Sequence, residues 1–456
     1  MARRSDISKV LNSLSKEELI RIIIQVADQD ELFKNGLLVK YVQGDHTEQL
    51  QLCKKLMDSI VNKYVGRDGF IPYRETYSFA MDMLDLLEET DEARDSGLAL
   101  EIALLVLQEG VAAFQYADDS DGNIGMLVEE SLESIRGIAS SPDRQDASCR
   151  EHVFERLLTV SNNEIFEGWE DYRIVLLRTC AELAEEEKLR EQLKEDIERQ
   201  IAVYTHDKHG KYTVEALLKL LFQLIRDYGS EEEADRFVEE HLSYTFFRKS
   251  AIETCMESGD YRRVIQLSQE GERQDQQLPG LLTQWKTARY EAYKKLSLKN
   301  EQRLLAKELL LGGDYTYYQD LESLAEGDKE EFYRGILAEL KKGGNWKGRG
   351  VYLQLISDKN DLEEMMAYVR TTPTAVEEYA ARLSKDYPEE VERIYRSYIH
   401  TVAGSSSNRK EYQRVCDMLK RYQRVFGKMS QSEIMLQLKE QYNRRPAFLD
   451  ELSKVR

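Results

Sequence analysis

The chain has 456 residues, of which 41% are hydrophobic and 32% are charged, and its formal net charge is −20. This apolar content excludes a wholly disordered chain. The acidic balance argues against a surface for duplex nucleic acid over most of the chain. Gly and Pro together make up only 31 residues, so long uninterrupted elements are expected, and helices fit best.

The sequence predicts neither a secretory leader nor a membrane span. The longest apolar-rich stretch, residues 214–225, is interrupted by polar and charged residues and is shorter than the ~20 residues that a span requires. The five cysteines are scattered and odd in number, without paired spacing. They predict reduced thiols in a cytoplasmic protein.

The first part of the chain is predicted to be helical. Ser15 and Glu18 match a capping box, in which each side chain accepts a hydrogen bond from the backbone amide of the other residue. Asp30 is predicted to start the next helix. Further helices are expected at 48–65, 73–87, 96–108 and up to 138. The linker Ser140–Asp143 then predicts a domain boundary near residue 143.

Longer helices are expected beyond this linker. The pattern predicts amphipathic segments at 152–160 and 169–201, and a buried helix at 212–228, which is apolar almost all round. A second capping box begins at Ser230.

A weak internal repeat then follows, in which a turn of a glycine, a polar residue and an aromatic residue separates successive helices. It occurs at Ser258–Tyr261, Gly312–Tyr315 and Gly343–Trp346. Glycine suits the left-handed residue after a helix, and Asp or Asn suits the N-cap of the next. The uneven spacing predicts an irregular solenoid.

The C-terminal end differs in charge from the rest. After a predicted linker at 401–408, which contains Gly404, the chain is basic. Residues 393–456 contain 14 Lys and Arg against 6 Asp and Glu, a local charge of +8, so the remainder carries −28. An acidic body with a basic end is therefore expected.

These features predict an all-α fold, an irregular α-solenoid of stacked helix pairs with an N-terminal helical domain. The predicted divisions are 1–143 for the N-terminal helical domain, 144–402 for the helical-repeat domain and 403–456 for the basic C-terminal helical segment. A chain of this length should hold roughly 18 to 22 helices.

Two short motifs resemble known binding loops. Ala117–Gly122 resembles part of a calcium loop, but Ala117 and Val128 occupy ligand positions, so a capped turn is the favoured interpretation. Gly343–Gly350 lacks the Lys and Ser/Thr of a phosphate loop and follows no strand, so it is interpreted as a helix–helix turn.

Three phrases of the sequence resemble the helical region that follows the zinc finger in bacterial SWIM-domain proteins. They are Leu14–Leu19 followed by Asp30–Leu32, Asp118–Gly125, and Tyr442–Leu452. The resemblance implies a helical scaffold that meets a finger-bearing partner. The Cys-x-Cys pair of the finger is absent, so zinc-dependent function does not carry over.

The function predicted from these features is a non-enzymatic scaffold or adaptor that binds a protein partner, with no cofactor and no membrane contact. Tyr315, Tyr317 and Tyr318 are candidate surface residues, since three such close positions cannot share one side of a helix. The alternative is a metal-dependent or Cys/His hydrolase, using the pair Cys149 and His152 or the acidic residues of 118–121.

A further alternative is a nucleic-acid-associated protein that binds through its basic end. A helix is predicted to present Arg414, Lys420, Arg421, Arg424 and Lys428 to a nucleic acid or an acidic protein partner. The favoured interpretation is that this helix packs on the chain's own acidic body through an apolar stripe, Val415, Leu419, Tyr422 and Phe426.

Overall fold

The computed structural model describes residues 2–42, 44–88, 96–141, 147–207, 210–343 and 346–455. These ranges form 24 α-helices and two short 3₁₀ helices, and they contain no strand beyond an isolated bridge between Ile71 and Ala117. The predicted all-α fold is confirmed.

The chain divides into two compact units, residues 1–247 and 248–456. The first unit (unit 1) contains α1 (Ala2–Asn12), α2 (Lys16–Ala27), α3 (Glu31–Tyr41), α4 (His46–Val65), α5 (Tyr73–Glu88), α6 (Ser96–Ala113), α7 (Asn123–Ala139), α8 (Ala147–Ser161), η2 (Glu164–Phe166), α9 (Glu170–Leu183), α10 (Glu187–Tyr204), α11 (Lys211–Tyr228) and α12 (Glu231–Glu240).

The second unit (unit 2) contains most of α13 (Thr245–Ser258), then α14 (Tyr261–Gln274), α15 (Pro279–Lys295), α16 (Lys299–Leu311), α17 (Tyr317–Ser323), α18 (Lys329–Gly343), α19 (Trp346–Asp358), α20 (Leu362–Thr371), η3 (Pro373–Ala375), α21 (Val376–Leu383), α22 (Pro388–Ser405), α23 (Arg409–Gln441) and α24 (Pro446–Ser453).

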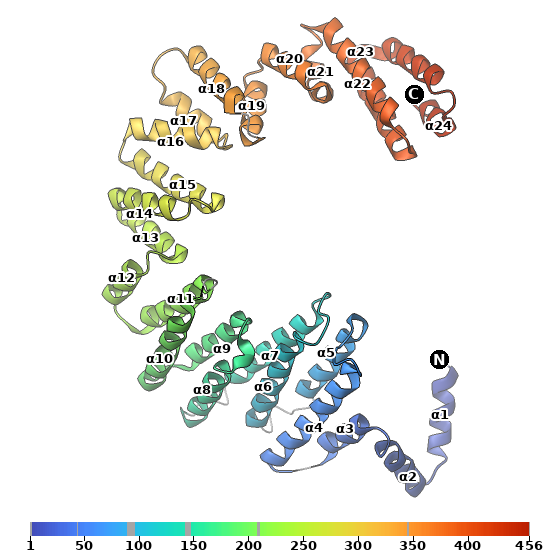
Figure 1. Ribbon diagram of the computed structural model, residues 1–456, viewed down its shortest axis with the longest axis vertical. Helices are drawn as coiled ribbons and strands as arrows, with labels where there is room; N and C mark the ends of the chain where they lie inside the picture. The colour runs from blue at the N-terminus through green and yellow to red at the C-terminus, as the bar shows by residue number, and fades with distance from the viewer. Residues whose placement is uncertain are drawn as a thin grey trace. The chain divides into compact units, whose positions relative to one another are not determined.

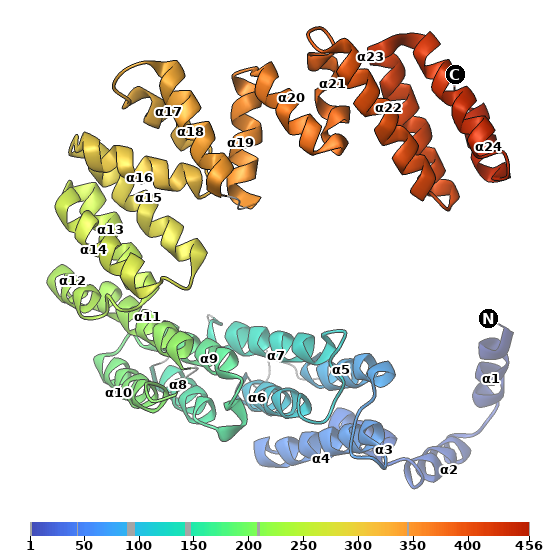
Figure 2. The same ribbon diagram turned by 45° about the horizontal axis from the view of Figure 1, so that its top comes forward.

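Within each unit the helices pack on their neighbours in sequence. Every substantial helix–helix contact joins elements no more than three helices apart along the chain. Figures 1 and 2 show these successive helices lying side by side. Such local stacking defines an α-solenoid, in which each helix pair buries its apolar side against the next pair.

The central helix of unit 1 is α6, which separates two hydrophobic clusters. Ile102 and Val106 face a cluster with α4, α5 and α7, whereas Leu100 and Leu104 face a cluster that extends to α11. Among the described residues, α6 is the one helix long and apolar enough to cross a membrane, and 56% of that window is buried. Its apolar surface is accounted for by these two clusters.

The core of unit 2 is rich in tyrosines whose hydroxyls reach acidic side chains on other helices. Tyr290 donates to Asp320 at 2.6 Å, and Tyr333 donates to Asp361 at 2.8 Å. Each ring is buried while its hydroxyl is satisfied at the edge of the core. The abundance of tyrosine is therefore explained largely by packing in this unit.

Several local predictions are confirmed. Ser15 and Glu18 form the predicted capping box at 3.2 and 2.8 Å, and Ser230 forms the second one. Gly259 adopts a left-handed φ of +80°, and Asp260 caps α14. The turn at Gly343–Trp346 includes residues 344–345, which lie outside the described residues.

Three predicted helices or linkers differ in the structure. The helix predicted at 169–201 is two helices, since α9 ends at Leu183 and α10 begins at Glu187. Between them, Arg190 donates to the carbonyls of Ala184 and Glu185 that the break leaves open. The linker predicted at 401–408 is helical as far as Ser405. The helix predicted to be buried at 212–228 has exposed ends, since Tyr212 is 80% exposed.

The observed division also differs from the predicted boundaries at 143 and 402. One hydrophobic cluster runs from α6 to α11 past residue 143, and another runs from α15 to α24 past residue 402. Residue 143 itself lies outside the described ranges. The 24 helices exceed the predicted 18 to 22 because several, such as α17 and α21, have only 7 or 8 residues.

Candidate functional site

A groove of about 700 Å³ lies over α10, α11 and α12 in unit 1. We call it the α10–α12 groove. Both α10 and α12 contact α11, and Figure 1 shows the three helices next to one another. The groove is lined by Glu187, Arg190, Glu191, Lys194, Glu198, Ile201, Leu218, Leu221, Leu224, Ile225, Tyr228, Gly229, Glu233, Phe237, Glu240 and His241.

The floor of the groove is apolar and its rim is acidic. Leu218, Leu221 and Leu224 of α11 recur at the three-residue spacing that places side chains on one helix face. Five glutamates against one arginine and one lysine line the rim. An apolar floor with a charged rim is the arrangement that accepts an amphipathic helix.

The cations of the rim are largely engaged within the chain. Arg190 lies over the ring of Tyr228, 4.2 Å from its centroid, while its guanidinium caps α9. Lys194 makes a long ion pair of 4.0 Å with Glu191. Glu198 and Glu240 form no ion pair within the described ranges. The groove therefore presents an excess of negative charge to a bound partner.

One end of the groove is shaped by a cluster of aromatic rings. The ring of His241 lies 4.2 Å from that of Phe237, and its Nδ1 lies 2.7 Å from the Phe237 carbonyl oxygen. Phe237 in turn packs near Phe222 and Phe247. These contacts fix the wall that α12 contributes.

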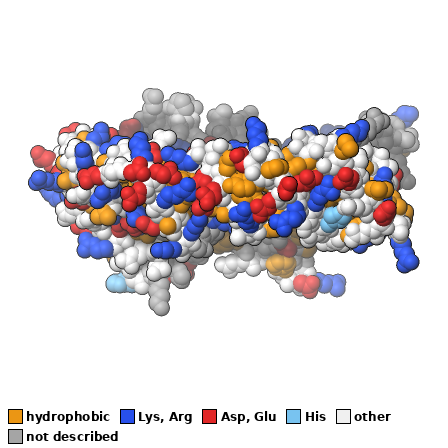
Figure 3. All heavy atoms as spheres, turned by 90° about the horizontal axis from the view of Figure 1, so that it is seen from above, with side chains coloured by type: hydrophobic (Ala, Val, Ile, Leu, Met, Phe, Trp, Pro, Cys, Tyr) orange, Lys and Arg blue, Asp and Glu red, His pale blue; other side chains and the backbone are white. Residues whose placement is uncertain are grey.

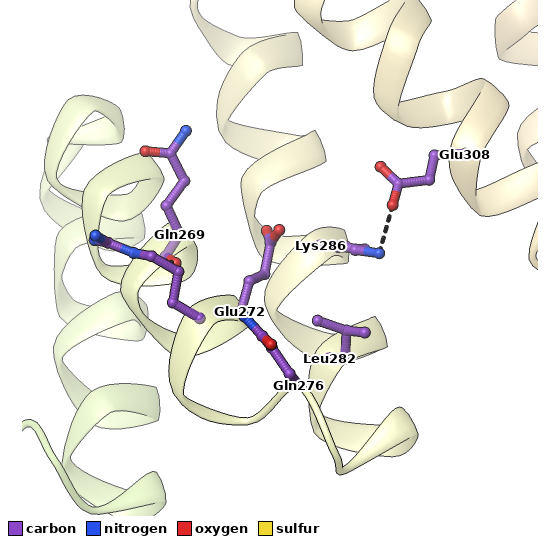
Figure 4. Close-up of a pocket in the computed structure, with 7 residues that line it drawn as sticks. Gln269, Glu272, Gln276, Leu282, Lys286 and Glu308 are labelled. Atoms are coloured by element: carbon purple, nitrogen blue, oxygen red, sulfur yellow. Dashed lines mark hydrogen bonds and ion pairs between the residues drawn. The ribbon is translucent and has the colours of Figure 1, made fainter.

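A more polar cavity of about 540 Å³ lies in unit 2, between α14, α15 and α16. Figure 4 shows Lys286 reaching from α15 toward Glu308 on α16, where the two side chains pair at 2.6 Å. Arg289 donates two hydrogen bonds to the carboxylate of Glu272, one from Nε at 2.7 Å and one from Nη2 at 2.8 Å. Because its charged groups already bind one another, this cavity offers little free chemistry to a ligand.

The three tyrosines predicted at the surface belong to the core. Tyr317 and Tyr318 are buried, with 9% and 2% of their surfaces exposed, and Tyr315 is half-buried against the same cluster. The prediction that one of them would be exposed is wrong. It assumed one helix through all three, whereas α17 begins at Tyr317, so Tyr315 turns inward and stacks on Tyr318 at 5.8 Å.

The basic residues of α23 are exposed, as expected, but they do not form one continuous helix face. Gly427 has a φ of +86° and interrupts the helix, so Lys428 belongs to a second segment. The second segment packs back on the first, with Gln431 donating to the Leu419 carbonyl at 3.2 Å. The basic helix that was predicted to include Lys428 therefore ends at residue 426.

Some of the predicted basic residues are neutralised by the chain. Arg421 pairs with Glu377 at 2.5 Å, and Lys420 pairs with Asp417 at 2.8 Å. Within the described residues Arg414, Arg424 and Lys428 make no ion pair. The stripe of Val415, Leu419, Tyr422 and Phe426 packs into the core of unit 2, as predicted. Figure 3 shows acidic and basic side chains interspersed over the face in view.

The acidic residues of 118–121 act as turn and helix caps. Asp119 accepts the amides of Ile124 and Gly125 at 2.7 and 3.2 Å, and Asp118 accepts that of Ser120. No group of three potential metal ligands occurs among the described residues. Cys149 and His152 are the two residues of the alternative Cys/His hydrolase site. Cys149 is half-buried and His152 is exposed.

The α10–α12 groove was not predicted from the sequence. Its signal is present there, since an almost wholly apolar helix stands between two helices that begin with glutamate runs, Glu185–Glu187 and Glu231–Glu233. Taken separately, each run is typical of a solvated helix face. Only the packing of α10 and α12 on either side of α11 shows that Glu187 and Glu233, one residue from each run, line the same groove.

Together, the helical stacking and the groove define a helical-repeat protein of the α-solenoid class. No protein-family model and no curated protein matches the chain. A solved structure described as a circular tandem repeat protein with novel repeat topology and enhanced subunit contact surfaces is 16% identical, over 95% of this chain and 94% of that one. Its TM-score is 0.18, so we draw nothing further from it.

Proposed function

We propose that this chain is a non-enzymatic scaffold that binds a protein partner through the α10–α12 groove. The observation that supports the proposal is the combination of an apolar floor with an acidic rim in a groove of about 700 Å³. Solenoids commonly present such grooves between helix pairs, and a helix can occupy one through side chains at positions i, i+3 or i+4, and i+7.

The charge of the rim selects the chemistry of the partner. Five glutamates with two largely engaged cations favour a helix that carries Lys or Arg beside its apolar stripe. Such complementarity accelerates encounter and disfavours acidic competitors. The proposed partner is therefore an amphipathic protein helix with basic flanks. A finger-bearing partner, as the resemblance to SWIM-domain proteins implies, stays a prediction.

A labelled helical peptide tests the proposal directly. The probe carries leucines at positions i, i+3, i+4 and i+7 with lysine flanks, and its binding to the intact chain is measured by fluorescence anisotropy. We expect saturable binding that weakens with salt, because the rim contributes electrostatically. A matched probe with glutamate flanks should bind at least tenfold more weakly.

Two variants locate the binding site. Glu191→Lys with Glu198→Lys reverses the charge of the rim and should weaken binding of the lysine-flanked probe by roughly three- to tenfold. Glu257→Lys changes an exposed glutamate of α13, outside the groove, and serves as the control. Equal binding of both probes, or equal loss in both variants, would overturn the proposal.

A further inference from the structure

Helix α1 exposes an apolar stripe at the spacing that a helix uses to enter a groove. Ile7, Val10 and Leu11 stand at positions i, i+3 and i+4, and they are between 41% and 61% exposed. Every side chain of α1 that the structure describes, residues 7–12, is exposed, and no substantial contact joins α1 to another described helix. The stripe is therefore available to a partner.

The sequence of α1 is also basic. It contains Arg3, Arg4 and Lys9 against a single acidic residue, Asp6, a balance of +2. The α10–α12 groove has the opposite sign, since five glutamates and two largely engaged cations line its rim. An apolar stripe on a basic helix is the chemistry that this groove favours.

Helix α1 and the groove match in length as well. The floor of the groove extends from Leu218 to Tyr228 on α11, which is about 15 Å at the rise of an α-helix. Helix α1 has 11 residues and is therefore about 16 Å long. One copy of α1 is thus long enough to cover the whole floor.

Two other helices of the chain lack one of these properties. Helix α2 has exposed isoleucines, but two glutamates balance its two cations. Helix α23 is basic, but its apolar stripe from Val415 to Phe426 is already packed in the core of unit 2. Helix α1 combines an exposed apolar stripe with a positive charge.

We propose that α1 of one copy of this chain occupies the α10–α12 groove of a second copy. The inference rests on the proposed function, and it names the partner of that same groove. Within one chain, α1 and the groove lie at opposite ends of the series of packed helices from α3 to α9 (Figure 2). In a two-fold symmetric pair each α1 fills the groove of the other copy, so the contact closes at two copies.

The mass of the intact chain in solution is the first test. Light scattering after size-exclusion chromatography should give about twice the 53.1 kDa of one chain at micromolar concentration. Ile7→Glu with Leu11→Glu should give a monomer with unchanged helical circular dichroism, because both side chains are exposed and glutamate is a good helix former. Asn12→Glu adds a negative charge to α1 outside the stripe, and this control should remain dimeric.

A charge exchange tests whether α1 meets the groove itself. Arg3→Glu with Arg4→Glu should weaken the dimer, and so should Glu191→Lys with Glu198→Lys on the rim. A chain that carries all four substitutions again has opposite charges on α1 and on the rim, so it should recover the dimer. Failure of this rescue would overturn the inference, because a merely structural role of α1 predicts none.

The lysine-flanked probe separates failure of this inference from failure of the proposed function. If about nine grooves in ten are filled, the monomeric Ile7→Glu/Leu11→Glu chain should bind the probe about tenfold more tightly than the wild-type chain. A monomeric wild-type chain that binds the probe would overturn this inference alone, whereas absence of probe binding to every variant would overturn both. Dimers that persist in the Ile7→Glu/Leu11→Glu chain, or assemblies larger than two copies, would also overturn the inference.

Discussion

The hydroxyl of Tyr290 on α15 donates a hydrogen bond of 2.6 Å to the carboxylate of Asp320 on α17, and it accepts one from Gln302 on α16 at 3.0 Å. One phenol therefore joins three successive helices of unit 2. The hydrogen bond from Tyr290 is the largest cause that lowers the pKa of Asp320, and burial raises the pKa of Tyr290.

Removing this hydroxyl should weaken unit 2 in a pH-dependent way. Tyr290→Phe should lower the free energy of unfolding by about 1 kcal/mol near pH 7. Because the pKa of Asp320 is lowered by folding, its contribution is present above its ordinary pKa of about 3.9 and is lost as the pH falls through the folded-state value. Urea denaturation at about pH 7 and at about pH 2, well below that ordinary value, measures both effects.

A double-mutant cycle with Asp320→Asn controls for unrelated losses. The two substitutions should be non-additive at neutral pH, because each removes the same contact. Strict additivity, or a Tyr290→Phe effect that is as large in acid as at neutral pH, would contradict the assignment.

Gly271 on α14 is predicted to be irreplaceable for steric reasons. A Cβ added at this position would lie 2.9 Å from the ring of Trp285, which is 2% exposed. Gly271→Ala should therefore destabilise unit 2 by about 1–3 kcal/mol, although alanine is the better helix former. Thermal unfolding followed by circular dichroism measures the change.

Gly335 on α18 is the matched control, since an added Cβ there would meet nothing within 4 Å. Gly335→Ala should be neutral or stabilising by up to ~1 kcal/mol. A stabilising effect of both substitutions would mean that the α14–α15 contact is looser than the structure indicates.

Gly427 is predicted to be required by backbone geometry. Its φ of +86° and ψ of 170° belong to a region that side chains essentially never occupy. Gly427→Ala and Gly427→Asn should each lower the free energy of unfolding by about 1–3 kcal/mol, as measured by urea denaturation. Gly350→Ala on α19, where no atom lies near the added carbon, is the control. Full stability of Gly427→Ala would argue for one continuous helix through α23.

The thiols should differ sharply in reactivity. Burial raises the pKa of Cys180 far above its usual range and raises the pKa of Cys416 to about 11, whereas Cys149 is half-buried. Because the thiolate is the reactive form, iodoacetamide at about pH 8 should label Cys149 roughly tenfold or more faster than either of the others. Peptide mass spectrometry in the native state, with urea-unfolded protein as reference, reports the rates. Equal labelling of the three thiols in the native state would contradict their burial.

The exposed arginines of α23 provide a check on the nucleic-acid alternative. Arg414 and Arg424 have no ion-pair partner among the described residues, but the rest of the chain is strongly acidic. We expect the intact chain not to retain a DNA duplex on filters at about 150 mM salt, because each phosphate contact is weakened by salt. Retention that is lost in Arg414→Glu with Arg424→Glu would establish this alternative instead.

Composition and local pattern were enough to predict the fold class and much of the local structure. Helix-forming composition, scarce glycine and proline, and the capping residues at Ser15, Ser230 and Asp260 act over a few residues, so they can be recognised without a fold. The buried stripe of the basic end, from Val415 to Phe426, was likewise predicted, because helical periodicity places its residues on one face.

Contacts between helices determine which surfaces remain open. Tyr315, Tyr317 and Tyr318 were expected near the surface, but their burial depends on where α17 begins and on which helices pack against it. The glutamates of the α10–α12 groove form a site only because α10 and α12 pack on either side of α11. Periodicity shows that a helix has an apolar face, but whether that face is covered depends on contacts between distant residues, which no local pattern encodes.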